Sequence, residues 1–81
     1  MTKTLKRRTR GRPKYADAEA VRRKRVEARL SQTQLATAVG VKQPHISAIE
    51  RGTASPSVDL LHKLAEALKC ELAEIMYKAA S

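Results

Sequence analysis

The amino-acid sequence predicts an all-α protein, a compact five-helix bundle preceded by a disordered basic arm. Three observations support this prediction. Apolar residues recur at helical spacing in short stretches between residues 17 and 78. Capping and stop signals stand at the ends of these stretches. The first 14 residues carry seven basic residues and no acidic one, without hydrophobic periodicity that could offset the entropy lost on ordering. We therefore divide the chain into a flexible arm over residues 1–16 and a folded domain over residues 17–78.

The stretch from Ser31 to Gly52 predicts two short helices joined by a tight turn. Ser31 and Gln34 have the spacing of a capping box, in which each side chain bonds the backbone N–H of the other. Gly40 can adopt the positive φ that ends a helix, and Pro44 suits the first turn of the next one. The apolar stripes of the two helices consist of Leu35, Ala36 and Val39, and of Ile46 and Ile49.

Three further helices are expected around this central pair. The first covers residues 17–29, and its inner face consists of Val21, Arg25 and Ala28. The fourth covers residues 57–69 with Ser57 as its N-cap. Its predicted buried stripe consists of Val58, Leu61, Leu64, Ala65 and Leu68. A last helix covers about residues 72–78.

Charge and composition narrow the class of partner. The 81 residues carry a formal net charge of +9, which points to a polyanion such as nucleic acid or an anionic membrane. Residues 1–30 hold twelve Lys and Arg against three Asp and Glu, whereas residues 31–81 hold five against five. The only aromatic residues are Tyr15 and Tyr77, so the chain lacks the platforms on which single-stranded nucleic acids stack. Duplex DNA is therefore the favoured partner.

The sequence also argues against several other classes of protein. Cys70 stands alone, which excludes a disulfide framework and fits a reducing cytoplasm. No apolar run approaches the roughly 18 residues of a membrane span, and no signal-peptide core is present. His45 and His62 have no neighbouring ligands, and no catalytic constellation is found, so we expect no enzyme activity, no metal site and no cofactor. No effector pocket is recognisable either.

The basic arm contains the sequence Arg10-Gly11-Arg12-Pro13-Lys14, which resembles the core of an AT-hook. Proline restricts such a peptide to an extended path, glycine permits close approach to a groove floor, and arginines favour the negative potential of a narrow minor groove. The arm would then read A·T-rich DNA. The alternative is a nonspecific basic arm that only adds charge.

The helix over residues 43–51 has an outer face that is small and polar. It consists of Gln43, Pro44, Ser47, Ala48 and Arg51. Such a helix suits the major groove, where glutamine can bond an adenine edge and alanine or proline can touch a thymine methyl group. The alternative is an ordinary helical hairpin whose outer face is solvated.

Several motifs together are similar to the Cro/repressor-type helix-turn-helix family, also called the XRE family. The likeness covers about residues 21–76 and combines an arginine in the first helix with L-S-Q-x-x-L-A-x-x-x-G-V, I-S-x-I-E-R-G, a proline four residues on, and L-x-K-L-A-x-A-L. The resemblance implies a lambda-repressor-like bundle of five helices whose third helix lies in the major groove. Phage and plasmid repressors, restriction-modification controllers and some antitoxins belong to this family.

The resemblance also implies roles for individual residues on and beside the third helix. Gln43 would be the principal base reader, and Gln32 would hold a phosphate and brace the third helix. The residues expected to face bases are Gln43, Pro44, Ser47 and Ala48. Those expected near phosphates are Gln32, Lys42, His45 and Arg51. Pro44 and Ala48 depart from the family pattern, since neither side chain can form a hydrogen bond.

A second group of residues matches structural positions of the family. Arg25 and Glu50 match a pair that forms a salt bridge inside the domain, and both lie on faces that otherwise look buried. Lys69 and Glu71 stand where the family often has glycine and a Ser or Thr cap, so the turn before the last helix should be less regular. The apolar residues hardest to place inside so small a bundle, and hence the candidates for a homodimer interface, are Leu60, Ile75 and Met76.

The sequence thus predicts a homodimeric transcriptional regulator, a repressor that binds a palindromic operator in the cytoplasm and associates with the nucleoid. The arms would add contacts in the minor groove or to the backbone. Activation through RNA polymerase is an open alternative. Two others are an antitoxin-type module that binds a toxin protein, and an architectural protein that binds DNA without regard to sequence.

Overall fold

The computed structural model describes residues 16–76 and consists of short helices. The elements are α1 (Ala18–Glu27), α2 (Gln32–Val39), α3 (Gln43–Arg51), α4 (Val58–Leu68) and the 3₁₀ helix η2 (Leu72–Glu74). The expected AT-hook-like arm lies outside the described residues. None of the helices described is long and apolar enough to cross a bilayer.

Local sequence signals account for where the central helices begin and end. The Ser31 hydroxyl accepts from the backbone N–H of Gln34, whose side chain accepts from the Ser31 N–H, so the expected capping box closes α2 at its start. Gly40 ends α2 with a φ of 79°, and Gly52 ends α3 with a φ of 78°, both in the left-handed region. Ser57 caps α4 by accepting from the Leu60 N–H.

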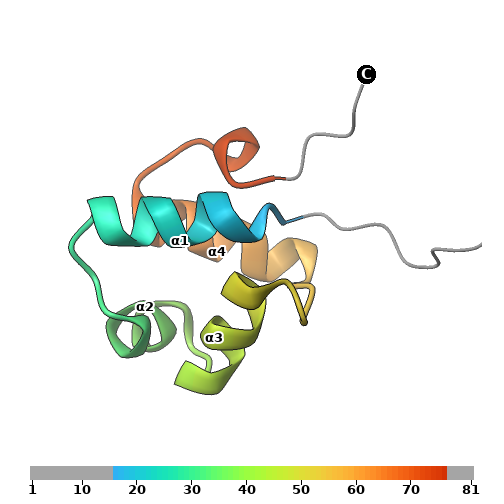
Figure 1. The fold of residues 1–81 in the computed structure, drawn as a ribbon. Coiled ribbons are helices and arrows are strands. Elements are labelled where there is room, and N and C mark those ends of the chain that lie inside the picture. Colours follow the sequence, from blue (N-terminus) through green and yellow to red (C-terminus); the bar gives the residue numbers. More distant parts are fainter. Residues whose placement is uncertain (1–15, 77–81) are drawn as a thin grey trace, which may run out of the picture.

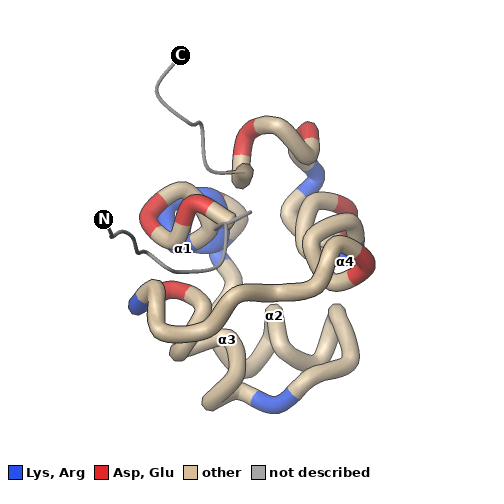
Figure 2. The backbone as a smooth tube through the Cα atoms, turned by 90° about the vertical axis from the view of Figure 1, so that its right-hand side faces the viewer, with Lys and Arg blue, Asp and Glu red and all other residues tan. Residues whose placement is uncertain are grey.

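The helices pack so that α3 keeps one face free. Helix α3 packs against α2 and α1, while α2 also contacts α4. Figures 1 and 2 show α1 and α4 on one side of the molecule and the pair α2 and α3 on the other. Because the core lies between these two groups, the outer side of α3 faces away from the bundle.

The core contains the expected apolar stripes with two exceptions. Its largest fully buried side chains are Val21, Leu35, Ile46, Ile49, Leu61, Leu64 and Ile75. Val58 was predicted to be buried but is 53% exposed, because it is the first residue of α4 and precedes the part of the helix that meets the bundle. Ala28 is also exposed rather than inward, since α1 ends one residue before it.

The C-terminal part of the domain differs from the expected fifth α-helix. Residues after α4 form only the three-residue η2, so the described chain has four α-helices rather than five. The Ile75 carbonyl accepts from the Asp17 N–H at 2.9 Å, and Met76 forms an isolated antiparallel bridge with Ala16. These backbone bonds tie the segment to the start of α1, and a longer helix would have carried it away from that contact.

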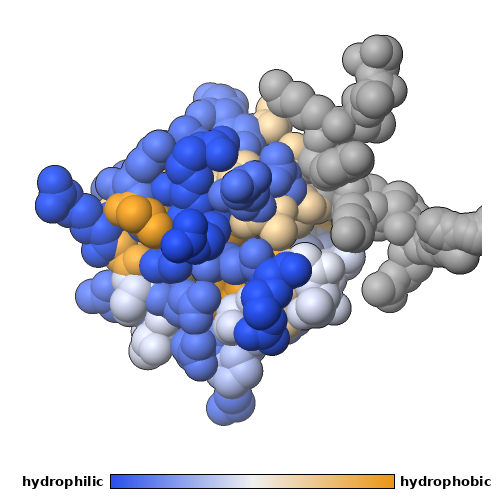
Figure 3. Space-filling model, in the orientation of Figure 1, coloured by the Kyte–Doolittle hydropathy of each residue, from blue (hydrophilic) through white to orange (hydrophobic). Residues whose placement is uncertain are grey.

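Two of the three candidates for a dimer interface are buried within the monomer. Leu60 is 8% exposed and Ile75 is fully buried within the monomer. The expectation that they would find no place in the core was therefore wrong. Met76 is half-buried. On the face shown in Figure 3 the surface is mostly hydrophilic, with small separate apolar areas.

An ion pair that the sequence analysis did not foresee joins α1 to η2. Lys24 Nζ lies 2.7 Å from Glu74 Oε1. The hydrogen bond from Lys24 and a second one from the Glu71 backbone lower the pKa of Glu74, and the same contact with Glu74 raises the pKa of Lys24. Burial raises the pKa of the nearby Cys70 thiol, which suits a residue that packs against the core.

Candidate nucleic-acid interface

The outer face of α3 is set by the two isoleucines on its opposite side. Ile46 and Ile49 are buried, and at 100° per residue the direction opposite to them falls close to Pro44 and Arg51. Both of these residues are exposed, and Ser47 and Ala48 beside them are half-buried. The face proposed from the sequence is therefore the one that α3 presents to solvent.

Below this face a chain of hydrogen bonds crosses three helices. The Arg25 guanidinium donates to both carboxylate oxygens of Glu50, with Nε to Oε2 at 2.7 Å and Nη2 to Oε1 at 3.2 Å. The Gln32 amide donates to Glu50 Oε1 at 3.0 Å, and the Gln43 amide donates to Gln32 Oε1 at 2.7 Å. The side chain expected to read bases is thus linked, through two intermediates, to a charge on α1.

Because it is largely buried, this chain of hydrogen bonds holds the Gln43 side chain rigidly. The side chains of Arg25 and Glu50 are 14% and 3% exposed, so the pair expected from the sequence lies where a lone charge would be costly. A third bond, from Arg25 Nη1 to the Leu30 carbonyl at 2.8 Å, holds the guanidinium in place. Because Gln32 uses both ends of its amide, it fixes the orientation of Gln43 before any ligand arrives.

The remaining polar group at the centre of the face is also partnered. Arg51 Nη1 donates to the Ser47 hydroxyl oxygen at 2.6 Å, one helical turn away. Lys42 precedes α3 as its N-cap, without a side-chain capping bond, and is exposed. His45 is half-buried on the flank of the helix. Lys42 and Arg51 therefore place positive charge at the two ends of α3.

The electrostatics of the pair α2 and α3 favour an anion. Between residues 31 and 52 the charged residues are Lys42, Glu50 and Arg51, and the Glu50 carboxylate is buried against Arg25. Four acidic residues lie instead along α4 and the segment that follows it, as Figure 2 shows. The two exposed charges on α3 and at its N-cap are thus both positive.

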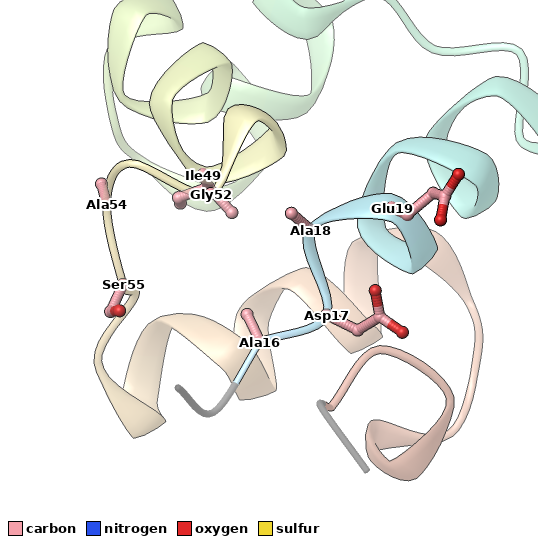
Figure 4. A pocket seen from close by; sticks show the side chains of 8 residues that line it. All are labelled: Ala16, Asp17, Ala18, Glu19, Ile49, Gly52, Ala54 and Ser55. Carbon is pink, nitrogen blue, oxygen red and sulfur yellow. The ribbon is translucent and has the colours of Figure 1, made fainter. Parts of the chain in front are cut away.

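A shallow depression marks the place where the chain enters the domain. It has a volume of about 180 Å³ and lies between the start of α1 and the end of α3, as the labelled residues in Figure 4 show. Its lining includes Ala16 and Asp17 from the entry of the chain and Gly52 and Ala54 from the turn after α3. Ala16, the first residue that the structure describes, thus lines the same depression as the turn after α3.

The sequence predicts which residues lie on the outer face of α3, but not all of their hydrogen bonds. The Arg25–Glu50 ion pair forms as expected. For Gln32 the family resemblance implies a brace on the third helix, but not its individual bonds with Glu50 and Gln43. The Ser47–Arg51 bond was missed, although its i, i+4 spacing on a helix was available as a signal. Among residues 16–76, no group of His, Cys, Asp or Glu could hold a metal ion.

Two short helices joined across a left-handed glycine, with the second held against the bundle and open on its outer side, define the helix-turn-helix class of domain. The sequence profile of the helix-turn-helix family matches residues 21–75. The chain therefore belongs to the helix-turn-helix family.

Relatives with similar sequences carry related names. The chain is 42% identical over 57 residues to an "Uncharacterized HTH-type transcriptional regulator" of Methanothermobacter thermautotrophicus, covering 70% of this chain and 83% of the relative. It has the same identity over 57 residues to a protein of that description in Mycobacterium tuberculosis. The matched part spans only 40% of the length of the mycobacterial protein.

Solved structures show the same fold. The restriction-modification controller C.AhdI from Aeromonas hydrophila superposes with a TM-score of 0.68 at 33% identity, over 70% of this chain and 83% of the controller. The P22 c2 repressor in complex with a synthetic operator gives 0.65 at 33% identity, over 68% and 83%. The biofilm regulator SinR in complex with DNA gives 0.67 at 27% identity, over 72% and 97%.

Proposed function

We propose that this protein is a sequence-specific DNA-binding transcriptional regulator, a homodimeric repressor that places α3 in the major groove of a palindromic operator. The observation that carries the proposal is the braced outer face of α3. Gln43 is held in one orientation by Gln32, which is itself bonded to the buried ion pair of Glu50 and Arg25. A base reader that is already oriented loses little conformational entropy on binding.

Charge supports DNA as the ligand. The exposed charges that flank α3 are Lys42 and Arg51, and both suit phosphates on the two sides of a groove. The net charge of +9 adds attraction to a polyanion that does not depend on sequence. The P22 c2 repressor and SinR, with similar folds, were solved in complexes with operator and DNA, which supports the same mode of binding here.

The basic arm is proposed to extend the contact beyond the major groove. Its attachment point at Ala16 lies beside Gly52 at the end of α3, so an extended arm can reach DNA next to the groove that α3 occupies. Seven basic residues in the first 14 positions would then meet backbone phosphates or an A·T-rich minor groove. The arm increases affinity in either case, and only minor-groove insertion makes affinity depend on A·T content.

The proposal is tested by selecting bound duplexes from a random pool, with the full chain and a variant lacking residues 1–14 in parallel. We expect both proteins to recover one palindrome, and only the full chain to enrich A·T-rich flanks. Half-sites whose centres lie about 34 Å apart, one turn of DNA, are expected for a dimer whose two copies of α3 enter successive major grooves.

Two results would contradict parts of this function. If neither protein recovers a motif and binding only falls steeply with salt, the protein is an architectural DNA binder. A single, unrepeated half-site would contradict the homodimer. Binding by the full chain should fall with salt more steeply than binding by the shortened one, with a slope difference of at most about 6 for the seven phosphate contacts of one arm, or about 13 for the two arms of a dimer.

A further inference from the structure

The first turn of α3 presents a purely hydrocarbon side chain to solvent, that of Pro44. Pro44 and Ala48, at i and i+4, carry only hydrocarbon side chains. The Ser47 hydroxyl oxygen accepts from Arg51 at 2.6 Å, and the Gln43 amide is tied to Gln32. Gln43 and Ser47 thus each use one hydrogen-bonding group within the protein, whereas the side chains of Pro44 and Ala48 offer only hydrocarbon.

An exposed hydrocarbon side chain in the first turn of α3 suits an apolar group on the ligand. Pro44 is exposed and lies in the first turn of α3, opposite the buried Ile46. Recognition helices contact base edges mainly with their N-terminal residues. The only apolar group that base pairs display in the major groove is the C5 methyl of thymine, and a methylated cytosine carries its methyl group on the same carbon.

We propose that Pro44, flanked by Ala48, contacts the C5 methyl group of a pyrimidine and accepts thymine and 5-methylcytosine alike. The inference rests on the proposed function, because it assumes α3 in the major groove. Thymine and 5-methylcytosine differ at C4, where one has a carbonyl and the other an amino group. Neither proline nor alanine has a side-chain atom that could distinguish those two groups by hydrogen bonding. The contact therefore depends only on the methyl group.

The first experiment changes only the DNA. With the full chain and the selected duplex, each thymine of one half-site is replaced in turn by deoxyuridine, which removes the methyl group and keeps both hydrogen bonds of the pair. We expect one thymine, or two adjacent ones, at which affinity falls roughly 3- to 5-fold, the effect of one methyl group leaving an apolar contact. At that position 5-methylcytosine should bind better than cytosine by a similar factor.

The second experiment changes the protein. Pro44→Ser removes the hydrocarbon ring at the second position of α3, and its melting curve checks that the domain still folds. With this variant, thymine and deoxyuridine at the sensitive position should bind equally. Val58→Ser is the matched control, because Val58 is likewise an exposed apolar residue in the first turn of a helix, α4. It should retain the full difference between thymine and deoxyuridine.

The outcomes separate this inference from the proposed function. A recovered motif without any methyl-sensitive thymine overturns the contact while the regulator function stands. Methyl sensitivity that persists in Pro44→Ser, or preference for cytosine over 5-methylcytosine, also overturns it. If Pro44→Ser does not fold, the deoxyuridine series and the methylcytosine comparison decide by themselves. Failure to recover any motif refutes the proposed function, and this inference falls with it.

Discussion

Replacing Arg25 by alanine should destabilise the domain far more than any exposed arginine does. The substitution removes two hydrogen bonds to Glu50, at 2.7 and 3.2 Å, and one to the Leu30 carbonyl at 2.8 Å. The Glu50 side chain is only 3% exposed, so water cannot replace the guanidinium fully. Its remaining side-chain partner is the Gln32 amide at 3.0 Å.

The free energy of unfolding should fall because the substitution leaves the buried Glu50 carboxylate without its counter-ion. Removing one member of a buried ion pair costs about 3–5 kcal/mol, against about 0–1 kcal/mol for an exposed pair. Since a small domain is stabilised by only about 5–15 kcal/mol in total, Arg25→Ala should lower the melting temperature by roughly 10 °C or more. Circular dichroism measures the melting temperature in a thermal ramp and the free energy of unfolding in a urea titration.

Two companion variants make the test specific. Arg23→Ala removes an exposed arginine from the same helix and should change stability by at most about 0.5 kcal/mol. Adding Glu50→Gln to Arg25→Ala replaces the stranded carboxylate by a neutral amide, so the double variant should be more stable than Arg25→Ala alone. A loss below about 1 kcal/mol in Arg25→Ala, the size typical of exposed pairs, would refute the reasoning.

Three further predictions concern binding, pH and backbone strain. Gln32→Ala should weaken binding of the selected operator about 10-fold, or about 1.4 kcal/mol, because Gln43 loses the acceptor that orients it; fluorescence anisotropy measures this, and unchanged affinity would contradict the brace. The pKa of Glu74 is lowered from its ordinary 4.5 by the bond from Lys24, so the pair stabilises the fold above that pH and ceases to do so as pH falls through the lowered pKa. Melting temperatures of the wild type and Glu74→Gln should therefore converge in acid, and a constant gap would argue against the pair. Lys69→Gly should raise the free energy of unfolding by about 0.5–1 kcal/mol in urea titrations, because Lys69 has a φ of 55°, where a side chain costs roughly 1–2 kcal/mol; a loss of stability would show that the Lys69 side chain contributes more than its backbone costs.

Some expectations failed because burial depends on where a helix ends and what crosses it. Val58 fits the apolar period of α4, yet it is exposed because it is the first residue of the helix and precedes the part that packs on the bundle, which begins at Leu60. Leu60 and Ile75 seemed surplus to the core. Leu60 belongs to the core cluster. Ile75 is buried where the segment after α4 turns back as η2 and bonds to the start of α1, which no periodicity along the chain encodes.

The central helices and the residues on the outer face of α3 could be predicted from the sequence. The signals are local: the Ser31–Gln34 capping box, the glycine that ends α2, and the isoleucine stripe all act within one or two helical turns. Such interactions form between residues that are close in the chain, so their spacing can be read directly.

Which polar groups on and beside α3 bond within the protein depends on how the helices are packed. The chain of bonds from Arg25 to Gln43 joins residues on three helices, and the segment around Ile75 joins the two ends of the domain. These contacts depend on how helices cross in space, which the spacing of residues along the sequence does not specify. Packing therefore orients Gln43 through its bond to Gln32, and it leaves the hydrocarbon side chain of Pro44 exposed on the outer face of α3.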